Sequence, residues 1–108
     1  MTQIKPQDLR IGNYVQFKQN PYHQIRFGSE LDRNVFEPIP LSEEILLKCG
    51  FEKVEHCFLF KGFCIEPKPK RGCFFFYFRD KLIRQVNVLH DLQNIVFSLV
   101  GEELTITL

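Results

Sequence analysis

The most regular pattern of apolar positions lies near the C-terminal end of the chain. At about 100° per residue, the apolar residues of the stretch 88–100 other than Phe97 fall within about 140° of arc. Polar residues, Gln93 and Asn94 among them, fill the opposite side. Gly101 follows, and glycine readily takes the left-handed conformation that ends many helices. The pattern predicts an amphipathic helix at about 88–100 with its apolar side against a core.

A shorter helix is predicted at about 42–50 from the residues at its two ends. Ser42 is suited to the N-cap, where its hydroxyl accepts a hydrogen bond from an unpaired backbone amide. Glu43 and Glu44 would then lie at the positive end of the helix dipole. Gly50 is suited to the C-terminal end. Two turns of helix are too few to be stable alone, so packing must hold them.

Elsewhere the apolar positions are typical of strands. Residues 73–78 (CFFFYF) form an unbroken apolar run, which favours a central strand covered on both faces. Residues 82–86 are expected to return as its hairpin partner after a turn at 79–81. Residues 51–65 alternate in part and predict one or two strands with a turn near 61–62. Further short strands are expected from residue 14 to an end at 20–21, and at 24–27, 35–36 and 104–108.

These elements alternate without the regular spacing of strand–helix–strand units, which favours a mostly antiparallel sheet with two helices. The predicted fold class is therefore α+β. The short N-terminal strands suggest a small barrel-like subassembly. Residues 66–72, with two prolines and three cations, are expected to form a solvated loop. A chain of 108 residues is near the usual size of one domain, so residues 1–108 are expected to form a single domain.

Composition indicates a core built largely from one kind of ring. The chain has 12 Phe and no Trp, and each buried ring removes a large apolar area from water. The N-terminal residues lack the apolar segment of a signal peptide. No stretch approaches the roughly 18 apolar residues of a membrane span. We expect a cytoplasmic protein with free thiols and no membrane association.

Charge is distributed unevenly along the chain, although the net charge is only +1. Residues 61–84 hold seven Lys or Arg and two acids, which is a net charge of +5. The candidate partner- or anion-binding cations flank the aromatic run 74–78. They are Lys68, Lys70, Arg71, Arg79, Lys81 and Arg84. Cations beside aromatic rings are typical of single-stranded nucleic-acid sites, whereas cations at the two ends of a core strand also serve only to keep it soluble.

Phe97 is a further candidate for the binding site. It lies off the apolar arc of the predicted helix at 88–100, near His90. Such a ring is often covered in part by a neighbouring loop. The alternative is that Phe97 anchors a partner or the interface of a homodimer, since aromatic residues are enriched at interfaces.

Recognisable catalytic and metal-binding patterns are missing from the sequence. The cysteines at 49, 57, 64 and 73 match no CxxC spacing, and apolar neighbours raise the pKa of a thiol. The pairs His56-Cys57 and His90-Asp91 lack the further ligands that zinc needs. Glu43-Glu44 is explained by the helix dipole, and no phosphate-binding glycine loop is present. We therefore expect no enzyme activity, no metal and no cofactor.

Three segments carry a resemblance to a known family. They are DLRIGNYV, PIPLSEEILLKCGF and VLHDLQNIVFSLVGEELTITL. They resemble the LRIGN, PIPLTEEWLLKFGF and VHQLQNLYFALTGEEL segments of small uncharacterised proteins of Bacteroides-type bacteria and their phages and prophages. Residues 16–37 and 57–72 do not match. The family has no established activity, so the resemblance implies a mobile-element origin and a cytoplasmic location, in the host cell if phage-encoded.

The leading hypothesis is a non-enzymatic interaction protein of phage or mobile-element type. It would bind a host protein or complex, in one version as an inhibitor of a host defence system. Small size, uneven charge and the family resemblance favour this interpretation. The alternative is a protein that binds nucleic acid or a nucleotide through the basic region 61–84, with an affinity that falls steeply with salt.

Overall fold

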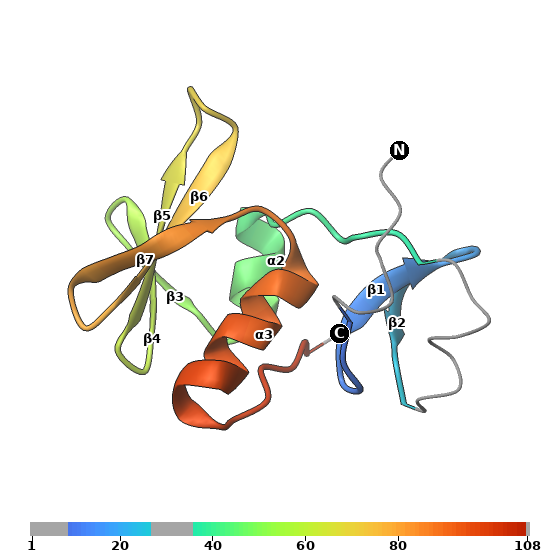
Figure 1. Ribbon diagram of the computed structural model, residues 1–108. Coiled ribbons are helices and arrows are strands. Elements are labelled where there is room, and N and C mark those ends of the chain that lie inside the picture. The colour runs from blue at the N-terminus through green and yellow to red at the C-terminus, as the bar shows by residue number, and fades with distance from the viewer. Residues whose placement is uncertain (1–8, 27–35, 108) are drawn as a thin grey trace. The chain divides into compact units, whose positions relative to one another are not determined.

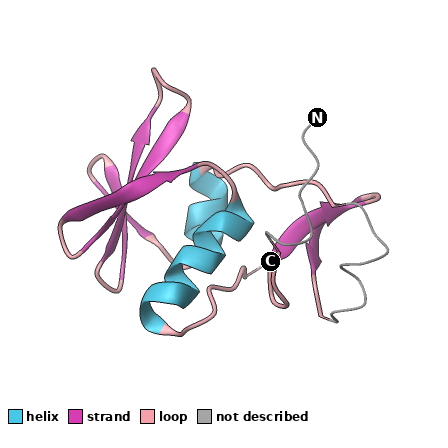
Figure 2. Ribbon diagram, in the orientation of Figure 1, coloured by secondary structure: helices cyan, strands magenta, loops and turns pink. Residues whose placement is uncertain are grey.

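The computed structural model describes residues 9–26 and 36–107, and it has an α+β fold (Figures 1 and 2). The described residues form two antiparallel sheets and two helices. They divide into two compact units. Unit 1 contains residues up to 40 together with 88–104, and unit 2 contains 41–87 together with the residues from 105. The expectation of a single domain stays a prediction.

Unit 1 contains a two-stranded sheet and the longer helix. Strands β1 (Tyr14–Phe17) and β2 (Asn20–Gln24) pair antiparallel, with Val15 opposite His23. The first strand begins at Tyr14 as expected, but it ends at Phe17 rather than at 20–21, because a turn at 18–19 separates it from β2. The second strand lies at 20–24 rather than 24–27. The two described strands form a hairpin, not a closed barrel. Most of the strand expected at 35–36 lies outside the described residues.

A small apolar cluster forms the core of unit 1 beside this hairpin. Its buried members are Leu9, Val15, Ile25 and Phe36. Residues that follow the hairpin continue the pairing. Gln16 and Glu37 exchange two backbone hydrogen bonds, with N–O distances of 2.8 and 3.0 Å.

The longer helix, α3 (Leu89–Val100), confirms the prediction at about 88–100. Its buried apolar residues include Leu89, Leu92 and Val96, as the helical period requires. Gly101 ends it in a left-handed conformation with a φ of 72°. The polar side differs from expectation, because Gln93 is completely buried.

Unit 2 contains a five-stranded antiparallel sheet in the order of the sequence. The strands are β3 (Glu52–Val54), β4 (Cys57–Phe60), β5 (Phe63–Lys68), β6 (Cys73–Phe78) and β7 (Lys81–Val86). Tight turns join them in a continuous meander. At the β6–β7 turn, Arg79 and Asp80 both have positive φ values, which suits the twist of a two-residue hairpin.

The shorter helix, α2 (Glu43–Lys48), precedes this sheet and confirms the prediction at about 42–50. The backbone N–H of Ile45 donates to the Ser42 hydroxyl at 3.2 Å, as expected for the N-cap. Lys53 on β3 forms an ion pair with Glu43 at 2.6 Å. Phe51 and Phe60 lie with their ring centroids 5.2 Å apart, beside the positive-φ residue Gly50.

Three local expectations were wrong. Residues 51–65 contain three strand segments, because an additional turn at 55–56 separates β3 from β4. Pro67 lies within β5 rather than in a loop; it is opposite Phe74, beyond the part of β5 that pairs with β4. Residues 104–107 alternate between buried and exposed but form no strand.

Candidate binding surface on the five-stranded sheet

Alternation along β5 and β6 divides their side chains between two faces of the sheet. On one face, Phe63, Ile65 and Phe76 are each at most 1% exposed. Phe63 lies between Phe76 and Phe78, with centroid distances of 5.4 and 4.9 Å. This face therefore belongs to the core of unit 2 and uses the phenylalanines that the composition predicted.

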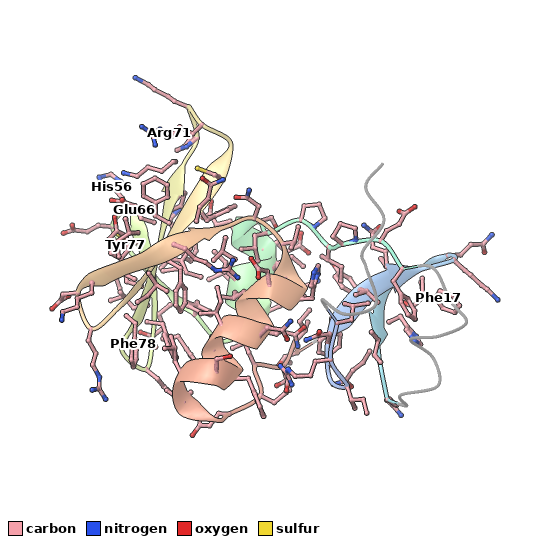
Figure 3. The ribbon with its side chains drawn as sticks, in the orientation of Figure 1. Phe17, His56, Glu66, Arg71, Tyr77 and Phe78 are labelled. Atoms are coloured by element: carbon pink, nitrogen blue, oxygen red, sulfur yellow. The ribbon has the colours of Figure 1, made fainter. Side chains whose placement is uncertain are left out.

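The opposite side of the same two strands remains partly exposed, and we call it the open face. It consists of Glu66 and Lys68 from β5, Phe75 and Tyr77 from β6, and Arg71 from the turn between them. Figure 3 labels Glu66, Arg71 and Tyr77. In the register, Glu66 lies opposite Phe75. The expectation that β6 is covered on both faces is corrected, because Phe75 and Tyr77 are only half-buried. The unbroken run of six apolar residues does not reveal that two of its aromatic residues lie on a partly exposed face.

Glu66 is the centre of the polar contacts on the open face. Lys68 Nζ lies 2.7 Å from Glu66 Oε1, and the Tyr77 hydroxyl donates to the same oxygen at 3.3 Å. The hydrogen bond from Lys68 holds the pKa of Glu66 below its ordinary value, against the opposing effect of partial desolvation. Glu66 is therefore ionised at neutral pH. Its negative charge lies within the surface that sequence analysis treated as basic.

The same contacts also shift the pKa values of Lys68 and Tyr77, the two partners of Glu66. The hydrogen bond to Glu66 raises the pKa of Lys68. Partial desolvation raises the pKa of Tyr77, and the charge of Glu66 adds to this effect. Near neutral pH, the cationic Lys68 and the neutral hydroxyl of Tyr77 therefore both contact the anionic Glu66.

Two cations lie near the ring of Phe75. Lys68 Nζ is 5.4 Å and Arg71 Cζ is 5.8 Å from the ring centroid. These distances are within the range of cation–π attraction. The aromatic ring and the two cations therefore form one combined surface.

The six candidate cations do not form a single cluster. Lys68, Lys70 and Arg71 lie at or beside the β5–β6 turn, whereas Arg79 and Lys81 lie at the β6–β7 turn. Six strand residues separate the two turns, which corresponds to about 20 Å. Arg84 follows both turns in the sequence and lies on β7, opposite Phe76 of β6. The stretch with a net charge of +5 is thus divided between the two ends of one hairpin.

Phe97, the remaining candidate, is 41% exposed at the end of α3 in unit 1. The guanidinium of Arg10 lies over its ring, with Cζ 4.2 Å from the centroid. This cation–π contact explains how an aromatic residue is held off the apolar arc of the helix. The role of Phe97 as an anchor for a partner or a second copy stays a prediction.

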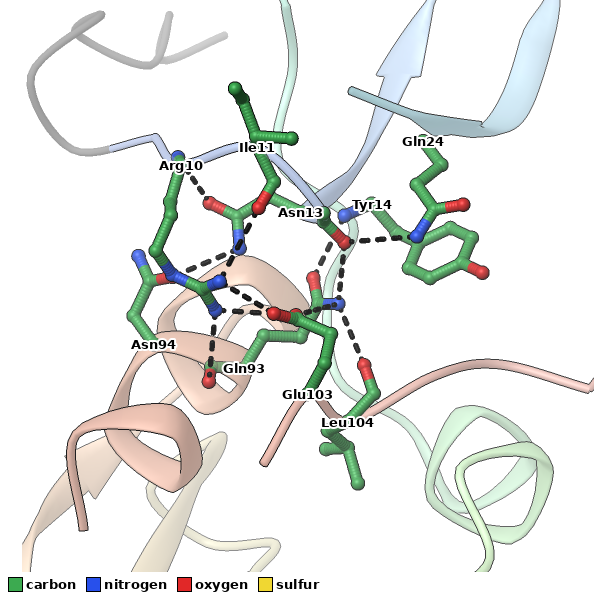
Figure 4. A network of polar contacts seen from close by, with 10 residues as sticks. Arg10, Ile11, Asn13, Tyr14, Gln24, Gln93, Asn94, Glu103 and Leu104 are labelled. Atoms are coloured by element: carbon green, nitrogen blue, oxygen red, sulfur yellow. Dashed lines mark hydrogen bonds and ion pairs between the residues drawn. The ribbon is translucent and has the colours of Figure 1, made fainter. Parts of the chain in front are cut away.

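Arg10 also belongs to a polar network that sequence analysis missed (Figure 4). Its guanidinium donates to both carboxylate oxygens of Glu103, at 2.5 and 3.2 Å. The buried Gln93 side chain accepts from Tyr14 N at 2.8 Å and donates to Leu104 O at 2.8 Å. Glu103, which follows the end of α3, is therefore held by an ion pair with Arg10.

Gly12 is placed where this network allows no side chain. Its φ is 101°, and a Cβ atom would lie 3.1 Å from the Glu103 carboxylate. The residues of the network come from DLRIGNYV and VLHDLQNIVFSLVGEELTITL, two of the three segments that carry the family resemblance. No local spacing links residues that lie about 80 positions apart, so only the fold reveals their contact.

Two of the described cysteines have thiols whose pKa is raised by their surroundings. Burial raises the pKa of the Cys49 thiol to about 12. Cys64 lines an open hollow of about 450 Å³ together with Lys61 and Asp80, and desolvation raises its pKa to about 11. Both thiols are therefore protonated at neutral pH. Within residues 9–26 and 36–107, no three His, Cys, Asp or Glu side chains are grouped as a metal site would require.

Among the described residues, neither helix has the length and apolar content needed to cross a membrane. Comparisons of the chain with protein-family models, with curated proteins and with solved structures found no match.

Proposed function

We propose that this is a non-enzymatic binding protein whose open face docks on an acidic region of a protein partner. The observation that carries the proposal is the half-exposed pair Phe75 and Tyr77, bordered by Lys68 and Arg71. Aromatic residues and Arg are enriched at protein interfaces. Arg71 would bind a carboxylate of the partner while the rings supply apolar contact area.

The charges of the open face favour a protein over a nucleic acid. A single-stranded nucleic-acid site needs a cationic groove that follows the phosphates. Here the ionised Glu66 lies beside the aromatic residues, opposite Phe75 and in contact with Tyr77, and it forms an ion pair with Lys68. The remaining cations are divided between two turns. A partner that presents a mixture of donors, carboxylates and apolar side chains fits this surface better than a chain of phosphates.

The family resemblance supports a host protein or complex as the partner. A small protein of mobile-element type acts within the host cell, where binding alone is enough to block a larger assembly. Inhibition of a host defence system would be one such action. It requires no catalytic residue on this chain, only a surface that competes for a site on the target.

The test is affinity capture from a Bacteroides-type host lysate with the tagged chain, at physiological salt and after nuclease treatment. The variants Phe75→Ala and Arg71→Glu should each lose a stoichiometric protein that the wild type retains. Lys18→Glu, an exposed cation on unit 1, is the matched control and should retain it. Equal capture by the wild type and both open-face variants would overturn the proposal. A parallel capture without nuclease that recovers only nucleic acid would overturn it as well.

A further inference from the structure

Strand β7 forms one edge of the five-stranded sheet and is exposed along most of its length. Residues 81–85 are all exposed, and Leu82 and Ile83 are 55% and 42% exposed. Among the described residues, no other strand pairs with its outer side. An edge of this length presents backbone donors and acceptors to which another extended chain can pair.

The other edge of the sheet is much less suited to pairing. Strand β3 has only three residues, Glu52–Val54. Its Lys53 is already engaged by Glu43 of α2 at 2.6 Å. A three-residue edge offers few backbone bonds, so β7 is the edge at which an added strand would gain most.

The charges near β7 favour an added strand that carries acidic side chains. Residues 79–86 include three cations, Arg79, Lys81 and Arg84, and one acid, Asp80. Pairing with β7 of a second copy would bring cations together, and like charges on adjacent strands are destabilising. A bulge leaves Ile83 without a partner on β6, which further disturbs a symmetric edge-to-edge pairing. The same cations would attract carboxylates.

We propose that β7 receives an extended acidic segment of a protein partner as a sixth strand of the sheet. The inference rests on the proposed function and names how the partner would be held. In the register, Leu82 lies opposite Tyr77 and Gln85 lies opposite Phe75. Alternate side chains of an added strand would therefore extend the open face, while its backbone pairs with β7.

The probe is a capped peptide of alternating Val and Glu, about ten residues long. Its binding is followed by amide NMR shifts of the full chain at about millimolar peptide, because main-chain pairing is largely independent of sequence. We expect the shifts to concentrate on β7 amides. N-methylation of one alternate set of peptide residues should weaken binding at least about tenfold, because several backbone bonds are lost. N-methylation of the other set, whose N–H groups point away, should have little effect.

Charge pairing is tested separately on the protein. Lys81→Glu should weaken binding of the Val–Glu peptide about threefold. It should strengthen binding of a Val–Lys peptide of the same length. Lys18→Glu on unit 1 is the control and should change neither. A circular-dichroism spectrum equal to that of the wild type ensures that Lys81→Glu has kept the fold.

Several results would overturn the strand-addition proposal. They are an absence of β7 shifts at millimolar Val–Glu peptide, equal weakening by both N-methylated sets, and a concentration-dependent dimer that Lys81→Glu abolishes. The proposed function fails differently. If Phe75→Ala and Arg71→Glu lose a captured protein while β7 shows no response, the open face binds a partner and only the strand addition is wrong.

Discussion

Gln93 is a polar residue on a helix that is buried more completely than most of its apolar neighbours. Its side-chain amide forms hydrogen bonds with three backbone groups from other segments of the chain. It accepts from Tyr14 N and donates to the carbonyl oxygens of Gly12 and Leu104. Unsatisfied buried backbone groups cost more free energy than a hydrogen bond gains, so the effect of losing Gln93 is asymmetric.

Gln93→Leu should therefore lower the free energy of unfolding by about 2–4 kcal/mol. The substitution keeps the approximate size of the side chain but leaves Tyr14 N and Leu104 O without their partner, and Gly12 O keeps only the donor Gln24. Urea unfolding followed by circular dichroism measures the change. Ser98→Ala, on the exposed side of α3, is the control and should stay within about 0.5 kcal/mol of the wild type. A similar small change for Gln93→Leu would contradict the structural importance of this network.

The lowered pKa of Glu66 predicts how the stability of the fold depends on pH. Because the folded state lowers its pKa, Glu66 stabilises the protein above the ordinary carboxyl pKa of 4.5. This stabilisation is lost as the pH falls through the lowered value. Below pH 4.5, the urea midpoint of the wild type should decrease with falling pH more steeply than the midpoint of Glu66→Gln. Glu52→Gln controls for the removal of one charge, and equal slopes for Glu66→Gln and the wild type would rule out this contribution.

At the scale of elements, β6 carries one aromatic set on each side of the sheet. Phe76 is completely buried, whereas Phe75 is half-buried beside two cations. Phe76→Ala should destabilise unit 2 by about 3–5 kcal/mol because it opens a cavity in a packed core. Phe75→Ala should cost well under half of that and leave the fold intact. Thermal or urea unfolding of the two variants compares them directly, and equal losses would show that the assigned faces are wrong.

The two helices were predictable because their signals are local. Ser42 and Gly50 indicate the ends of α2, and the 3.6-residue period indicates α3 with Gly101 as its end. The hairpin of β6 and β7 was also predictable from its apolar run and the turn that follows. By contrast, the break at 55–56 falls within a partly alternating segment and has no glycine or proline to indicate it.

At the scale of the whole molecule, each unit is built from two separate parts of the sequence, and residues 41–87 of unit 2 come between the two parts of unit 1. No periodicity reveals such an arrangement, because it depends on contacts between distant segments. The polar network of Arg10, Gln93 and Glu103 was missed for this reason. The candidate cations are exposed or half-exposed, but the separation of five of them between two turns follows from the antiparallel register.

This division of charge predicts weak binding to nucleic acid by the whole protein. At about 50 mM salt, an oligothymidine of about 15 nucleotides should bind the wild type no tighter than about 100 μM. The slope of log affinity against log salt should correspond to at most about three phosphate contacts, the number of cations at the β5–β6 turn. Glu66→Lys removes the acid from the open face and should strengthen binding several-fold with a steeper slope, as fluorescence anisotropy would show. Lys18→Glu is the control for charge elsewhere. Micromolar binding by the wild type with a steep slope would instead favour the nucleic-acid alternative, because the cations at the two turns would then act on one strand.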